Sequence, residues 1–579
     1  MKRWLVARGG LLALAALALY LWLAPTHVVD GDNAEFSGLA RLGGIAHPSG
    51  YPLYLLWLHA TSWLPGATAA HTAALATAIA GAGAVLVLHA ACRAWGARPL
   101  AATIACALAA AAPVFVRVAS EAEVFAPNVL VAAAVVWLAA REGPLRGGRR
   151  AAALGLVAGL GLSMHLTCIF VAPVGLLGVA RAAREAGART LALAVAGLVV
   201  GLLPYAYAFV APDTPLSWGA VRDVDRLIGH FTRREYGTSS LVAHGATAPW
   251  TASLVALAAT LARAWLWLPL AVGLATFAVR VARPSERGET RVAWAMLAAS
   301  WLVAGPAFVS RFNAAPEGIG LYIVHRFHVL PVMLLAIPVA VGLDALATWL
   351  PERAHAWARV ASPLAATLGF AAAAGLALPR VRALHTAAVE TGARNVLRML
   401  PERAVVLEYS DELYYAVNYL QWVEGERQDV TFVAWGVMSL PWYRDRVAAR
   451  GIVAEPGSEP ASVRLALHLL GEGRAVFVEP GFAELARAFP TYPFGPLVRV
   501  LPRGVPVPPV DDVVAQNRAI YAAFDLAYPR PSRDDEWAAL VHDRYAATWR
   551  AIAGALDAAG RTDDAAAARE LARALEPLP

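Results

Sequence analysis

The densest group of residues that could do chemistry lies in the first polar loop, directly after an apolar run. It contains three carboxylates, Asp30, Asp32 and Glu35, and then the segment His47-Pro-Ser-Gly-Tyr-Pro52. Carboxylates this close to a lipid boundary lose part of their hydration unless they contact water, a cation or a substrate. Their presence therefore favours a functional site in this loop.

A structural role for the same residues is open beside the functional one. Asp32-Asn-Ala-Glu35 has the spacing of a capping box, which predicts a helix that begins at Asp32 and ends near Leu42. Two prolines and a glycine in the next segment predict a rigid turn that presents His47 and Tyr51. That turn could equally be a plain chain reversal with Tyr51 as an interfacial anchor.

Further polar candidates lie near the ends of other apolar runs. An arginine matches phosphate oxygens in a bidentate manner, although an arginine at this position can also be an interfacial residue whose side chain reaches toward water. A glutamate beside Arg117 could instead form a structural salt bridge, and a lone histidine is often a satisfied buried residue. These further candidates are Glu121, Glu123, His165, Arg311, His325 and Arg326.

The composition indicates a membrane protein. Of 579 residues, 59% are hydrophobic and 16% charged, whereas a soluble domain carries about 25% charged residues. The net charge of +7 lies mostly in short arginine-rich loops between apolar segments, so we assign it to membrane topology and expect no nucleic-acid partner. The three cysteines have neither the spacing of a zinc site nor that of a disulfide framework.

The apolar segments predict about eleven membrane helices. Residues 151–180 are counted as a helical hairpin with His165 near its tip, because arginines flank both ends. The first segment is expected to be an uncleaved helix rather than a signal peptide. The other expected helices are near 4–24, 70–91, 99–116, 123–140, 190–211, 252–280, 291–310, 328–349 and 360–379.

The arginine clusters alternate from loop to loop, which predicts the topology. They place the N-terminus in the cytoplasm, and the loops near 25–69, 117–122, 212–251 and 311–327 outside, together with the chain after residue 380. The loop 212–251 is amphipathic and is expected to lie on the membrane surface, where it either covers the cavity or contacts the carrier lipid or the acceptor. The composition suggests a high-GC bacterium, so the expected location is the bacterial inner membrane.

Three domains are expected. Residues 1–380 form the membrane domain. Residues 381–545 form an extracytoplasmic α/β domain, because strand-like runs at 404–409, 430–433 and 475–478 alternate with amphipathic helices. Residues 546–579 resemble a single tetratricopeptide hairpin, which cannot bury its own face and so serves as a packing element.

Several of these motifs together resemble one family. It was long catalogued as a transmembrane domain of unknown function, is related to the protein O-mannosyltransferases and belongs to the GT-C superfamily. The resemblance spans about residues 25 to 435, and its motifs are Asp32-x-x-Glu35, His47-Pro-x-Gly-Tyr-Pro52, Glu123-Val-Phe, Gly161-Leu-Ser-Met-His165, Tyr419-Leu-Gln421 and Arg427-Gln-Asp-Val430.

The resemblance implies an α-helical GT-C-like membrane glycosyltransferase that moves a sugar, mannose or another hexose, from a polyprenyl-phosphate carrier to a hydroxyl of an extracytoplasmic protein or glycan. It implies Asp32 as the general base, with Asp30 as the alternative two residues away and Glu35 beside it. His47, Tyr51, Glu123 and His165 are then candidates for binding the substrate or carrier, as are Arg311, His325 and Arg326. The expected course is inversion at the anomeric carbon.

Other classes of protein and an added cation also fit part of the sequence. A transporter or flippase for lipid-linked sugars would share the many helices and arginines, but it would need paired broken helices or an internal repeat. A membrane-anchored scaffold would lose its function in a deletion ending near residue 380. No cofactor is required, and the acidic residues are not spaced as a metal cage, which leaves a divalent cation, Mg²⁺ or Mn²⁺, open.

Overall fold

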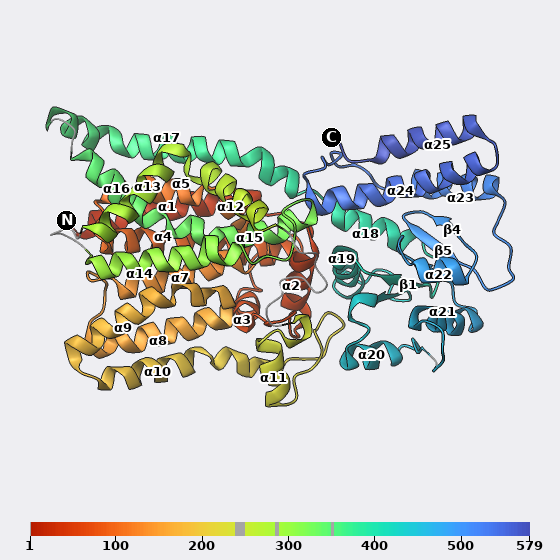
Figure 1. Ribbon diagram of the computed structural model, residues 1–579, viewed down its shortest axis with the longest axis horizontal. Coiled ribbons are helices and arrows are strands. Elements are labelled where there is room, and N and C mark those ends of the chain that lie inside the picture. The colour runs from red at the N-terminus through yellow and green to blue at the C-terminus, as the bar shows by residue number, and fades with distance from the viewer. Residues whose placement is uncertain (1, 238–248, 284–288, 349–351, 455) are drawn as a thin grey trace. The chain divides into compact units, whose positions relative to one another are not determined.

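The computed structural model describes residues 2–237, 249–283, 289–348, 352–454 and 456–579 (Figure 1). The chain divides into two compact units, each described here by itself. The membrane unit comprises residues 1–26, 45–211 and 221–382, and the α/β unit comprises residues 27–44, 212–220 and 383–579. Residues 27–44 carry the predicted first-loop carboxylates, and they fold with the C-terminal part of the chain.

The membrane unit is helical, and each expected crossing corresponds to a helix or a broken helix within the described residues. The elements are α1 (Lys2–Leu23), α3 (Pro52–Ala60), α4 (Ala69–Ala94), α5 (Pro99–Ala110), α6 (Pro113–Ser120), α7 (Phe125–Ala139), α8 (Gly147–Met164), η1 (Leu166–Val171), α9 (Ala172–Ala186), α10 (Arg189–Gly201), η2 (Leu203–Phe209), α11 (Val224–Phe231), η3 (Arg234–Tyr236), α12 (Trp250–Trp265), α13 (Trp267–Ala282), α14 (Arg291–Leu302), η4 (Val303–Ala307), α15 (Ile319–Leu334), α16 (Ala336–Ala347) and α17 (Glu352–Leu384).

Two of the expected straight helices are sharply bent. The segment at 99–116 breaks between α5 and α6 with a bend of 68°, where Pro113 begins the second helix. The segment at 252–280 breaks between α12 and α13 with a bend of 109°, at Leu266, which has a positive φ of 57°. Among the described residues, four helical segments are long and apolar enough to cross a bilayer, or six if each bent pair counts as one. The chain is a multi-pass membrane protein.

The predicted hairpin at 151–180 is present, and its neighbour packs onto it through glycines. α8 and α9 are joined at His165 and η1, and α10 then lies against α8. A Cβ atom on Gly155 would collide with the carbonyl oxygen of Ala194, and one on Gly197 would collide with that of Ala152. The two backbones therefore touch, as in the small-residue packing common between membrane helices.

The α/β unit contains one mixed sheet of five strands in the order β2-β1-β3-β5-β4, in which β1 pairs in parallel with β2 and β3, and β5 pairs antiparallel with β3 and β4. Its strands are β1 (Val405–Glu408), β2 (Thr431–Ala434), β3 (Val476–Val478), β4 (Thr491–Phe494) and β5 (Leu497–Val500). The first three match the predicted strands. Its helical elements are α2 (Gly31–Leu42), α18 (Ala388–Met399), α19 (Asp411–Trp422), η5 (Trp435–Val437), α20 (Pro441–Ala448), α21 (Ala461–Gly471), α22 (Ala483–Ala488), α23 (Val510–Ala522), α24 (Glu536–Ala558) and α25 (Thr562–Leu575).

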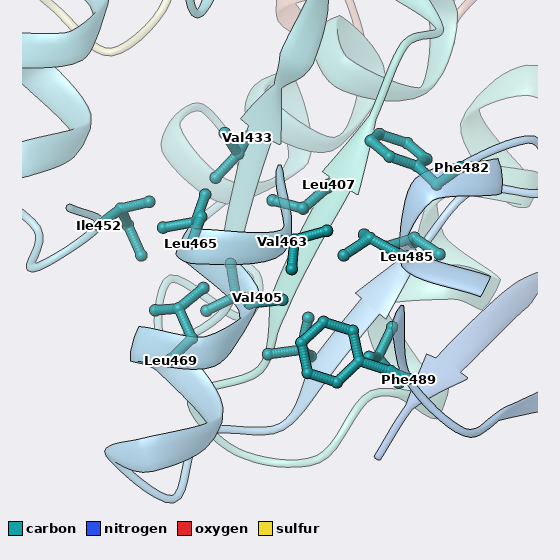
Figure 2. Close-up of a cluster of buried hydrophobic side chains, with 14 of the residues drawn as sticks. Val405, Leu407, Val433, Ile452, Val463, Leu465, Leu469, Phe482, Leu485 and Phe489 are labelled. Atoms are coloured by element: carbon teal, nitrogen blue, oxygen red, sulfur yellow. The ribbon is translucent and has the colours of Figure 1, made fainter. Parts of the chain in front are cut away.

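The two faces of this sheet differ in what covers them. Figure 2 shows Val405 and Leu407 of β1 in an apolar cluster with residues of α21 and α22, including Leu465 and Leu485. Because side chains alternate along a strand, Glu408 points to the opposite face of the sheet.

The C-terminal helices α24 and α25 pack as an antiparallel pair around their own apolar core, which includes Trp549.

Candidate functional site

The first turn of α2 fixes the arrangement of the three first-loop carboxylates. Asp30 is the N-cap: its Oδ1 accepts a hydrogen bond from the Asn33 backbone N–H at 2.8 Å. The prediction of Asp32 as the cap is therefore wrong, although the helix does end at Leu42 as expected. The reason is that Asp30 has the extended backbone of a capping residue, which leaves Asp32 inside the first turn.

Asp32 and Glu35 are one turn apart on α2, so their side chains are neighbours on the helix surface. Asp30 and Glu35 are buried, at 1% and 0% exposure, whereas Asp32 is half-buried. The positive end of the helix dipole stabilises a carboxylate anion in this turn. Asp32 is thus the most accessible of the three, and the pair offers the oxygen ligands that Mg²⁺ or Mn²⁺ accepts.

In the membrane unit, the predicted turn brings His47 and Tyr51 together. The Gly50 N–H donates to the His47 carbonyl at 2.8 Å, and the Tyr51 hydroxyl lies 3.1 Å from His47 Nε2. Gly50 has a φ of 91° and packs directly on His230, whose Nε2 lies 3.0 Å from the Ala46 carbonyl oxygen. The turn is therefore rigid, as the prolines and glycine predict.

His165 lies at the break between α8 and η1 and joins this cluster. Its ring stacks on Tyr51 with centroids 5.5 Å apart, and its Nδ1 accepts from the Thr167 N–H at 3.1 Å. Phe125 and Phe327 pack on the other sides of the ring, at 4.7 and 6.1 Å. The glycine-to-histidine turn of the sequence thus places an imidazole beside the first-loop turn.

The charged part of the cluster is an ion pair between α15 and the loop before α7. Arg326 Nη1 lies 3.2 Å from Glu123 Oε2 and 3.1 Å from the Tyr322 hydroxyl, and its guanidinium lies 4.2 Å from the centre of the Tyr322 ring. The predicted partner of Glu121 is present as well, because Arg117 lies 3.3 Å from it, with both side chains buried.

Phe125 joins the two parts of this cluster, because its ring packs on His165 and its centre lies 5.8 Å from the Arg326 guanidinium carbon. The cluster thus contains five of the predicted residues: His47, Tyr51, Glu123, His165 and Arg326. His325 lies one turn from His328 with rings 5.6 Å apart, and His328 lies 2.9 Å from Thr260 Oγ1. Arg311 is exposed after η4, and none of the described contacts links it to the cluster.

Sequence reasoning missed the aromatic residues that hold the charges. Tyr322 precedes Arg326 by one helical turn, a spacing that could have indicated the contact once a helix was expected there. Phe125 ends the Glu-Val-Phe motif, but it was not expected to pack on His165. Its role depends on α7, α8 and α15 meeting, and local sequence does not show this.

The C-terminal motifs that carried the resemblance are structural. Arg427 donates to the carbonyls of Leu397 and Leu400 and to Asp429, and Gln421 Nε2 donates to the Arg427 and Val430 carbonyls. The hydrogen bonds from Arg427 lower the pKa of Asp429 to about 2. These contacts tie the end of α19 to the start of β2, and so the motifs fix the α/β unit rather than a reaction site.

The fold and the motifs agree with comparisons to known proteins. The chain resembles the crystal structures of ArnT from Cupriavidus metallidurans, bound to undecaprenyl phosphate (TM-score 0.53, 15% identity, 86% of this chain and 99% of that one) and in the apo state (TM-score 0.50, 15% identity, 85% and 97%). The chain therefore shares the fold of these ArnT structures, which confirms the predicted class of a polytopic helical membrane protein.

The sequence comparisons point to a particular branch. Residues 32–186 match the family described as the protein O-mannosyl-transferase TMEM260 N-terminal domain. The mouse (Mus musculus) Protein O-mannosyl-transferase TMEM260 is 26% identical over 465 residues, which are 76% of this chain and 64% of the mouse protein. These matches confirm the resemblance to the protein O-mannosyltransferase-like family. The chain spans less than two thirds of the mouse relative's length.

Proposed function

We propose that the protein is a membrane glycosyltransferase that moves a sugar, mannose or another hexose, from a polyprenyl phosphate to a hydroxyl of an acceptor outside the cytoplasm. The observation that carries the proposal is the cluster of His47, Tyr51, Glu123, His165 and Arg326. It draws on four distant parts of the chain and gathers ionisable groups in a membrane unit, where such groups are costly unless they serve a function. The relatives are named as an O-mannosyltransferase and as a protein that binds undecaprenyl phosphate.

The proposed reaction needs one base and no general acid. As the acceptor oxygen forms its bond to the anomeric carbon, Asp32 takes the hydroxyl proton, and the bond between that carbon and the carrier phosphate breaks. The phosphate leaves with the electron pair, and direct displacement inverts the anomeric carbon. Asp30 is less suited to the role, because its carboxylate is buried and caps α2.

Arg326 is the proposed partner of the carrier phosphate. Its guanidinium forms an ion pair with Glu123 and stacks over the Tyr322 ring. Its orientation is therefore fixed before a ligand binds. A fixed donor stabilises the charge that develops on the leaving phosphate without reorganising during the reaction. In this proposal Glu123 orients Arg326, while His165 and Tyr51 form the wall beside the sugar.

An apolar cavity of 390 Å³ in the membrane unit supports a lipid carrier. It lies between α8, η1, α9 and α10, and among the residues that line it are Leu162, Cys168, Gly175 and Leu198. Leu162 and Cys168 each lie three residues from His165 in the sequence. We infer that the isoprenoid chain occupies this cavity while its phosphate lies by the polar cluster.

The experiment is sugar transfer from radiolabelled polyprenyl-phosphate mannose by purified wild-type protein, Asp32→Asn and Asp30→Asn in liposomes. Asparagine caps a helix about as well as aspartate, so Asp30→Asn keeps α2 intact and is the matched control. We expect Asp32→Asn to transfer at least about a hundredfold more slowly, and Asp30→Asn to retain most of the activity. Equal transfer by wild type and Asp32→Asn would remove Asp32 as the base.

Transport of a lipid-linked sugar is the second candidate function, and one observation favours it. Two helices, at α5/α6 and α12/α13, are broken, and broken helices are one of the features that the transporter hypothesis requires. A transporter would carry the labelled donor across the bilayer intact, whereas a transferase would release polyprenyl phosphate. Separation of these two products on thin-layer plates distinguishes the candidates.

The proposed setting is the bacterial inner membrane, with the N-terminus in the cytoplasm and the α/β unit outside. It follows from the alternation of arginine-rich loops along the sequence. Single cysteines placed on the α/β unit of the full chain, in a background without Cys92, Cys106 and Cys168, test it in intact cells. Labelling by an impermeant maleimide is expected there, and protection until the membrane is opened would reverse the orientation.

A further inference from the structure

The helix that carries the proposed base packs on other segments of the α/β unit. A Cβ atom on Gly31, the first residue of α2, would lie 3.2 Å from the carbonyl carbon and oxygen of Asp411 and 3.3 Å from the Glu412 nitrogen. These are backbone atoms at the start of α19, which cannot move aside as a side chain can. The first turn of α2, with Asp32 in it, is therefore in direct contact with the N-terminus of α19.

Two further contacts hold α2 from its other sides. The Val28 N–H, just before the helix, donates to Glu390 Oε2 of α18 at 2.9 Å. Gly38 packs directly on Leu216, which belongs to the segment 212–220. Arg446 of α20 anchors that segment, because its Nη1 donates to the Ser217 carbonyl at 2.5 Å. Every one of these partners lies in the α/β unit.

The start of α19 is held in turn by a buried cluster of charges centred on Arg544 of α24. Arg544 Nη2 donates to Ser410 Oγ at 2.8 Å, pairs with Glu412, and lies 3.3 Å from Glu479 Oε1. Glu479 also accepts from the Tyr409 N–H at 2.8 Å and from Ser410 Oγ at 2.7 Å. The cluster thus fixes the loop between β1 and α19 from three elements at once.

Such a cluster is a costly way to hold a loop. Glu412 and Glu479 are desolvated, and buried ion pairs seldom add net stability compared with apolar residues of the same size. The cluster does fix the position of α2, because both contact the same segment. Arg544 holds residues 410–412, and Gly31 of α2 packs on the backbone of residues 411 and 412. A general base must lie within hydrogen-bond reach of its proton, and a displacement of about 1 Å can cost a hundredfold in rate.

We propose that Arg544 is a positioning residue for the transfer reaction: through α19 it sets the position of α2, so the C-terminal helices control where Asp32 lies. The inference rests on the proposed function, in which Asp32 is the base. It gives the C-terminal segment of the α/β unit, residues 383–579, an indirect part in the reaction through the position of α2.

Two variants test this from opposite ends. Arg544→Met removes the guanidinium that pairs with the buried carboxylates of Glu412 and Glu479. This variant could therefore also unfold the α/β unit. Gly31→Ala leaves the charges intact and perturbs only the contact between α2 and α19. Because alanine favours helix over glycine, slower transfer by Gly31→Ala cannot come from a weaker helix.

The matched controls lie on α24. Arg550→Met removes an arginine that pairs with Glu576 at the surface, and Gly554→Ala adds a methyl group where nothing lies within 4 Å. Each protein is measured as full-length chain in liposomes, for kcat and KM with polyprenyl-phosphate mannose and for hydrogen exchange of the amides of 31–42. We expect both test variants to lower kcat by about 10- to 100-fold with little change in KM, and to speed exchange in α2. The controls should do neither.

The outcomes separate the inference from the function. If Asp32→Asn is inactive but Gly31→Ala and Arg544→Met keep the wild-type kcat per folded molecule and normal exchange in α2, the positioning role is refuted while the function stands. If Asp32→Asn transfers normally, the proposed base is wrong. The exchange of residues 31–42, which needs no activity, then still decides whether Arg544 holds α2.

Discussion

The ion pair between Glu123 and Arg326 gives the sharpest prediction about the membrane unit. The two side chains are 2% and 13% exposed, and their closest atoms are 3.2 Å apart. With an effective dielectric constant of about 20, their attraction is about 5 kcal/mol. Removal of one partner takes away this attraction while the other charged side chain stays buried, which we expect to lower the free energy of unfolding by about 3 to 5 kcal/mol.

The assay is a double-mutant cycle of Glu123→Gln, Arg326→Gln and the double variant, with unfolding followed by denaturant titration in micelles. We expect a coupling free energy of about 2 kcal/mol or more, because the double variant leaves no unpaired charge. Sugar transfer should behave differently: the double variant regains stability but stays slow, since the proposed phosphate partner is still absent.

The exposed pair of Asp225 and Arg234 is the matched control in the same unit. It has two hydrogen bonds, at 3.0 and 3.1 Å, but its side chains are 80% and 57% exposed, so solvent screens the attraction. We expect no coupling beyond measurement error there. A buried pair that couples no more strongly than this exposed pair, or a double variant with full transfer, would refute the reasoning.

Three further predictions concern packing, pH and the lipid cavity. Gly155→Ala should cost about 3 kcal/mol or more, because the added methyl group meets the Ala194 carbonyl, whereas Gly375→Ala, with nothing within 4 Å, should be neutral in the same unfolding titration. Burial, and then the nearby Glu479, raises the pKa of Glu408 well above 4.5. The folded state therefore holds that proton more tightly, so stability falls as the pH rises above about 4.5, and Glu408→Gln should melt higher than wild type at pH 8 but not at pH 4. Ala158→Trp, which fills the cavity, should raise KM for a long-chain donor but not for a short-chain one, and equal KM effects would place the chain elsewhere.

Local sequence predicted the elements well where one segment determines its own structure. The hairpin at 151–180 was recognisable from arginines at both ends, and strands β1 to β3 from their apolar runs. The hairpin of β4 and β5 was missed, because Pro493 within β4 weakens its strand pattern. Both bends lie near a proline inside an expected straight helix, at Pro113 and at Leu266, which precedes Pro269 by three residues.

The candidate site was predictable as a set of residues but not as an arrangement. Asp32 and Glu35 were found from their spacing, yet the cap proved to be Asp30, because a capping box can shift by two residues where two aspartates are available. That α2 folds with the C-terminal half depends on packing across more than 370 residues of sequence, between Gly31 and Asp411. A deletion ending near residue 380 consequently no longer separates a scaffold from a transferase, because it also removes the support of α2.

A transferase cleaves the bond between the sugar and its carrier, and a single-turnover experiment can follow that cleavage. Purified protein in liposomes is given donor labelled in both the sugar and the lipid, together with an acceptor peptide or glycan. We expect one polyprenyl phosphate to appear for each sugar that reaches the acceptor, and neither product to appear with Asp32→Asn. Intact donor recovered on the opposite side of the bilayer, with no free polyprenyl phosphate, would contradict it.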